Sequence, residues 1–142
     1  MNFKITFLLF VLVNMNIHYQ TTNVADFVRI DSLVNVSTFV SNFADYAMNI
    51  QAAGLASIPK ATISPKGALY IEYAYHSGGE NRNGKMTLYD KGNHRFEGSW
   101  KTDADNGNSY QGTLYFVFDK LGNADGYYKF GGREYEITIL KK

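Results

Sequence analysis

The feature that most constrains this chain is an alternation of apolar and polar residues that begins near Ala68 and continues almost to the last residue. A period of two is typical of β-strands, because successive side chains of a strand point to opposite faces of the sheet. Clusters of Gly, Asn, Asp and Ser interrupt the alternation and predict turns. The pattern predicts six strands, near 68–76, 85–89, 94–101, 110–118, 124–130 and 133–140. Such short connections favour an antiparallel meander, since parallel neighbours need a crossover of about a dozen residues.

A weak internal repeat accompanies these strands. Gly84, Gly98, Gly112 and Gly126 recur every 14 residues, and the residues two positions away from them are mostly large and apolar. Because 14 is an even number, all four glycines lie on one face of a period-two sheet. Glycine inside a strand costs stability, so a recurrent one indicates a tight bend or a bulky neighbour above it. Chance is the alternative, because the chain contains 13 glycines.

Parity divides the side chains of the predicted strands between two faces. One face is almost entirely apolar and predicts the core of the domain. Its members are Leu69, Ile71, Met86, Leu88, Phe96, Trp100, Leu114, Phe116, Phe118, Tyr128, Phe130, Tyr135, Ile137 and Ile139, which Tyr73 and Tyr75 join by parity. The opposite face is more polar, but it carries a tyrosine on four different strands.

These four tyrosines, Tyr70, Tyr89, Tyr115 and Tyr127, form the candidate ligand-binding site together with Glu72. A phenol ring offers a flat surface for stacking on a sugar or a lipid, and its hydroxyl group can orient the ligand. The alternative is cross-strand pairing of tyrosines, which stabilises a half-exposed sheet without any ligand.

A helix is predicted before the strands. Its apolar residues recur at alternating spacings of three and four, which places them on one helical face. They are Leu33, Val36, Val40, Phe43, Ala47 and Ile50. Asp31 or Ser32 can cap the start, and Gly54 suits the left-handed residue that ends a helix. We therefore expect a helix over about 32–53 and a linker over 54–67.

The first residues resemble a signal peptide. Lys4 precedes an apolar run from Ile5 to Val13, and this run is shorter than the roughly 18 residues that a membrane-spanning helix needs. We expect residues 1–25 to be removed after Ala25, or else after Gln20, which predicts a secreted or periplasmic protein without a membrane span. Residues 26–142 are enough for a single domain with one core.

Charge and titratable residues exclude several classes of function. Residues 26–142 are formally neutral, because the 14 basic and 13 acidic residues of the whole chain lose only Lys4. A neutral domain has no electrostatic footprint for nucleic acid. The absence of cysteine excludes disulfides and thiolate zinc sites, and His76 and His94 have no third ligand at a metal-binding spacing. We find no catalytic motif, so we predict no cofactor, no metal and no enzymatic activity.

The sequence thus predicts an α+β, mostly β, protein whose N-terminal helix packs on a six-stranded antiparallel meander, either a curled sheet or a small barrel. The predicted function is non-catalytic binding of an apolar small molecule or a glycan through the tyrosine-rich sheet face. The alternative is a secreted structural or protein-interaction domain with no small-molecule ligand. The ligand and the oligomeric state are not determined by the sequence.

Overall fold

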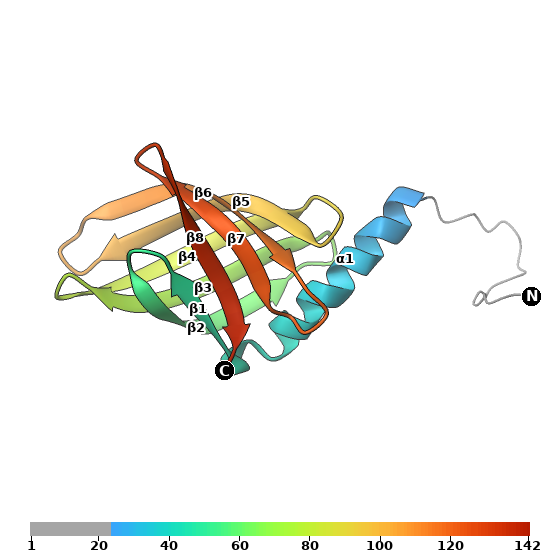
Figure 1. Ribbon diagram of the computed structural model, residues 1–142, viewed down its shortest axis with the longest axis horizontal. Helices are drawn as coiled ribbons and strands as arrows, with labels where there is room; N and C mark the ends of the chain where they lie inside the picture. The colour runs from blue at the N-terminus through green and yellow to red at the C-terminus, as the bar shows by residue number, and fades with distance from the viewer. Residues whose placement is uncertain (1–23) are drawn as a thin grey trace, which may run out of the picture.

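The computed structural model describes residues 24–142 and shows a closed barrel of eight antiparallel strands. Each strand pairs with its neighbours in the sequence, and the first strand pairs with the last (Figure 1). The elements are α1 (Val24–Ser41), the short 3-10 helix η1 (Phe43–Asp45), β1 (Tyr46–Ile50), β2 (Gly54–Ile63), β3 (Ala68–Ser77), β4 (Glu80–Asp90), β5 (Arg95–Ala104), β6 (Ser109–Phe118), β7 (Ala124–Phe130) and β8 (Arg133–Lys141). Most of the predicted signal segment, with Gln20, lies outside the described residues, and Ala25 falls in the first turn of α1.

The six predicted strands correspond to β3 to β8, and two further strands precede them. The prediction of a helix over 32–53 is wrong beyond Ser41, and the expected linker 54–67 consists mostly of β2. In β1 the side chains of Tyr46, Met48 and Ile50 are buried, so this segment follows a period of two. Pairing with β8 supplies the hydrogen bonds that make this segment a strand rather than a continuation of the helix.

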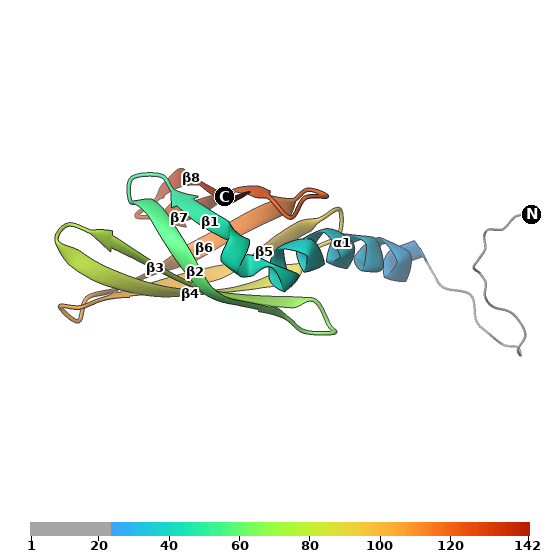
Figure 2. The same ribbon diagram turned by 90° about the horizontal axis from the view of Figure 1, so that it is seen from below.

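Helix α1 lies at one end of the barrel, and the turns that join β3 to β4 and β5 to β6 lie at the opposite end (Figures 1 and 2). Phe39 of α1 is fully buried, and its ring centroid lies 5.3 Å from that of Tyr46 and 5.6 Å from that of Phe118. The Asn35 side-chain amide donates a hydrogen bond of 3.0 Å to the backbone carbonyl of Phe118. The second half of the helix therefore closes this end of the barrel. Among the residues that the structure describes, no helix is both long and apolar enough to span a membrane.

The inside of the barrel is filled by side chains. Most of the predicted core is confirmed, and its fully buried members include Leu69, Leu88, Phe96, Phe116 and Ile139. Of the other predicted core residues, Tyr75, Tyr128 and Tyr135 are only partly buried, and the prediction is wrong for Phe130, which is exposed. All four lie near the barrel end that α1 does not cover. We call that end the barrel mouth.

The four glycines of the 14-residue repeat lie where the barrel wall leaves no room for a side chain. A Cβ atom at Gly98 would overlap the carbonyl oxygen of Thr87, and one at Gly126 would overlap the carbonyl oxygen of Tyr115. At Gly84 the obstacle is the ring of Tyr73. A bulky neighbour, one of the two causes that the repeat indicated, is therefore present at Gly84, whereas at Gly98 and Gly126 the obstacle is the backbone of the adjacent strand.

Candidate functional site

The outward tyrosines are placed by the register of four adjacent strands. Tyr89 on β4 lies opposite Glu97 on β5, and Glu97 lies opposite Tyr115 on β6. Tyr115 in turn lies opposite Tyr127 on β7. Because opposed residues of antiparallel strands point to the same face, these four side chains form a row across the outside of the barrel.

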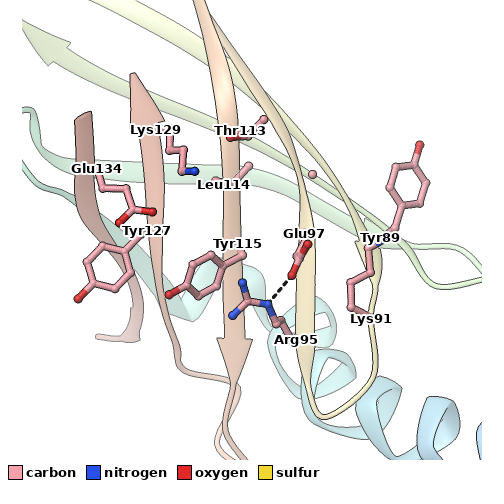
Figure 3. A pocket seen from close by; sticks show the side chains of 11 residues that line it. Tyr89, Lys91, Arg95, Glu97, Thr113, Leu114, Tyr115, Tyr127, Lys129 and Glu134 are labelled. Atoms are coloured by element: carbon pink, nitrogen blue, oxygen red, sulfur yellow. Dashed lines mark hydrogen bonds and ion pairs between the residues drawn. The ribbon is translucent and has the colours of Figure 1, made fainter. Parts of the chain in front are cut away.

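A shallow hollow of about 480 Å³ follows this row (Figure 3). We call it the outer hollow. It combines aromatic rings with charged side chains of both signs. Its lining consists of Tyr89, Lys91, Arg95, Glu97, Gly98, Thr113, Leu114, Tyr115, Tyr127, Lys129 and Glu134.

Arg95 organises the centre of the outer hollow. Its guanidinium lies 3.6 Å from the ring centroid of Tyr115, and its Nε donates to Oε2 of Glu97 at 2.5 Å. This hydrogen bond, together with the charge of Glu97, raises the pKa of Arg95 above its ordinary value. One face of the Tyr115 ring is thus covered by a cation, which leaves Tyr127 as the more accessible ring.

Tyr127 stands next to Tyr115 and is 39 % exposed. The two ring centroids are 6.0 Å apart with an angle of 46° between the planes. In Figure 3 the Tyr127 ring lies beside Glu134, whereas the Tyr89 ring on the far side of the outer hollow points away from both other tyrosines. The hollow therefore presents two exposed rings, Tyr89 at one side and Tyr127 beside the Arg95–Tyr115 pair, with acidic and basic groups around them.

Comparisons with known proteins assign no function to this arrangement. No family model, no curated protein sequence and no solved structure matches the chain.

Two of the predicted site residues lie outside the outer hollow. Tyr70 is on the same outer face and is 48 % exposed, but it lies opposite Thr62 and Thr87 and does not line the hollow. Glu72 lines a smaller hollow of about 210 Å³ between β2, β3, β4 and β5. The structure thus brings together Tyr89, Tyr115 and Tyr127.

Sequence reasoning missed Arg95 and Glu134 as members of this site. Arg95 has the same parity as Glu97, two residues later on β5, so its outward direction could have been found from the alternation. The contact of Arg95 with Tyr115 could not be predicted from the alternation, because it depends on the pairing of β5 with β6.

A second hollow of about 530 Å³ adjoins the first along the outer face. The two share Thr113. Hydroxyl groups of Thr87, Ser99 and Thr113 and the amine groups of Lys85 and Lys101 line it. Polar hydrogen-bonding groups therefore continue beyond the tyrosines. Within residues 24–142, no three His, Asp or Glu side chains are grouped so that they could hold a metal ion.

Proposed function

We propose that this protein is an exported carbohydrate-binding domain that holds a glycan in the outer hollow without catalysing a reaction. The observation that carries this proposal is the accessible ring of Tyr127 beside the fixed Arg95–Tyr115 pair. A sugar ring can stack its C–H groups on a flat aromatic surface while its hydroxyl groups bind neighbouring polar side chains.

The charged lining favours a glycan over an apolar ligand at this position. Lys91, Arg95, Lys129, Glu97 and Glu134 all border the outer hollow. An apolar molecule would remove water from these groups without replacing their hydrogen bonds, which is costly. Glycan hydroxyl groups donate and accept, so they can satisfy ammonium, guanidinium and carboxylate groups together.

The Arg95 contacts also reduce the cost of binding. Because Glu97 and Tyr115 already fix the guanidinium, little side-chain freedom is lost when a ligand arrives. The adjoining hydroxyl-lined hollow gives room for further sugar units, so we expect an oligosaccharide rather than a monosaccharide.

Replacing Tyr127 with serine should weaken glycan binding by about tenfold or more, because it removes the accessible stacking ring. The measurement is affinity electrophoresis in soluble xylan, mixed-linkage β-glucan, pullulan and glycol chitin, followed by calorimetry with oligosaccharides of the retarding polymer. The matched control is Tyr70→Ser, which removes a similarly exposed tyrosine of the same face outside the outer hollow. We expect the control to bind within twofold of the unaltered protein.

Two results would contradict the proposed function. One is the absence of retardation by every polymer in the panel. The other is equal weakening by Tyr127→Ser and Tyr70→Ser, which would place the ligand elsewhere on the barrel. Circular dichroism of each variant shows whether the barrel is intact.

A further inference from the structure

The barrel mouth, opposite α1, is surrounded by aromatic rings. Tyr73 and Tyr75 stack with ring centroids 6.1 Å apart, and Trp100 meets Tyr128 and Phe130 edge-on at 5.8 Å and 5.7 Å. Phe130 is 42 % exposed although it lies on the inner side of its strand. Partly exposed aromatic rings at the mouth of a barrel are a common setting for small-molecule binding.

A small cavity of about 50 Å³ lies among these rings. Its lining contains no charged side chain: Ile50, Ala53, Tyr73, Tyr75, Met86, Trp100, Thr102, Tyr128 and Ile137. A cavity of about 150 Å³ is needed to hold benzene, so this one has room for only a few heavy atoms. It can therefore take the end of a thin neutral molecule, with the rest lying against the rings outside.

The polar feature of this cavity is a pair of hydroxyl groups. Tyr73 and Thr102, which are 3 % and 2 % exposed, share a hydrogen bond of 2.5 Å between their oxygens. Two hydroxyl groups carry two hydrogens, and one hydrogen bond between them uses only one. Within residues 24–142 neither hydroxyl group has a further hydrogen-bond partner, so one donor is left over. Tyr73 also lines the hollow that contains Glu72, whereas Thr102 lines the uncharged cavity and not that hollow.

That donor is retained at neutral pH. Burial, as the main cause, raises the pKa of Tyr73 well above its ordinary value of 10.0, and the nearby Tyr75 and Tyr128 raise it further, while the hydrogen bond with Thr102 lowers it. The phenol therefore stays protonated. A buried donor without an acceptor is unfavourable, and an arriving acceptor would remove that cost.

We propose that the barrel mouth binds one end of a neutral aliphatic molecule that carries a hydrogen-bond acceptor, such as the carbonyl group of a ketone or an ester. The carbonyl oxygen accepts the hydrogen left over by the Tyr73–Thr102 pair. The alkyl chain packs against Tyr75, Tyr128 and Phe130 at the rim. This site does not depend on the glycan proposal: the cavity and the outer hollow have no lining residue in common, and Trp100 alone of the cavity lining also borders the adjoining hollow.

The experiment titrates the protein with 2-heptanone and follows the fluorescence of Trp100, the only tryptophan of the chain. We expect a saturable change, because Trp100 lines the cavity. The double variant Tyr73→Phe, Thr102→Val removes both hydroxyl groups with little change of shape, and it should raise the Kd about tenfold while the fold is kept. Ala53→Leu, which fills the cavity from the turn between β1 and β2, should abolish the response.

Tyr127→Ser is the control for this site, and we expect it to bind 2-heptanone as the unaltered protein does. A fluorescence change that does not saturate with 2-heptanone would overturn the proposal, because it would show that the cavity holds only water and does not bind the ketone. Equal affinity in the unaltered protein and in Ala53→Leu would overturn it as well, even if the double variant failed to fold. Loss of glycan binding with retention of 2-heptanone binding, or the reverse, separates the two proposals.

Discussion

Replacing Gly98 with alanine should lower the free energy of unfolding by at least about 3 kcal/mol or prevent folding altogether. The added Cβ atom would overlap the carbonyl oxygen of Thr87 on β4, which is backbone and cannot rotate away. Strands β4 and β5 would then have to separate at this point. Urea unfolding followed by circular dichroism measures the loss.

The matched control for this glycine is Gly107→Ala. Gly107 lies in the turn between β5 and β6, where a Cβ atom meets nothing within 4 Å, so the only cost arises from its φ of +88°. That cost should be about 1 kcal/mol. Similar losses for the two variants would contradict the account, because they would show that the wall of the barrel tolerates a side chain at Gly98.

Trp100→Ala should cost about 3–5 kcal/mol, the usual range for truncation of a large buried aromatic side chain. The indole ring packs edge-on against Tyr128 and Phe130, and its Nε1 donates to the backbone carbonyl of Lys129 at 3.2 Å. Gly112 lies directly against the same ring. The alanine variant therefore loses packing across β5, β6 and β7 and also a hydrogen bond.

Because Trp100 is the only tryptophan, circular dichroism rather than fluorescence must report this unfolding. Tyr70→Ala, on the outer face, should cost less than about 1 kcal/mol, since that ring is largely exposed. If Trp100→Ala cost less than Tyr70→Ala, the assignment of inner and outer faces would be reversed.

The last six strands were predictable because each alternates clearly and ends at a turn. The predicted bounds agree within one residue for β3, β6, β7 and β8, but β4 begins at Glu80 rather than at 85 and β5 ends at Ala104 rather than at 101. The alternation within single strands did not predict that the barrel closes, because closure depends on the pairing of β1 with β8, which lie at opposite ends of the domain sequence.

The first two strands were missed for identifiable reasons. Phe43, Ala47 and Ile50 fit a helical spacing, and this coincidence hid the alternation of Tyr46, Met48 and Ile50. In β2 the alternation is interrupted, because the register shifts between Ser57 and Lys60. Pro59 lies within that irregularity, where the missing backbone donor does least harm, but in the sequence it is typical of a linker.

Parity was also enough to place the tyrosines on the outer face, but it could not show which of them are close together. The side chains of Tyr70 and Tyr127 both point outward, but different residues lie next to them on the adjacent strands. The barrel mouth was not predicted as a site, because its aromatic residues have the same parity as the core residues. They differ from the core residues in lying at the open end of the barrel, and the alternation of the sequence does not show where that end is.

The location of the glycan is tested most directly by amide ¹H–¹⁵N spectra recorded while an oligosaccharide that binds in the polymer panel is added. We expect progressive shifts for Thr113, Tyr127 and Lys129 in the outer hollow, with no shift for Tyr70 or for α1. Shifts confined to the surroundings of Tyr70, or to the barrel mouth, would show that the glycan does not bind in the outer hollow.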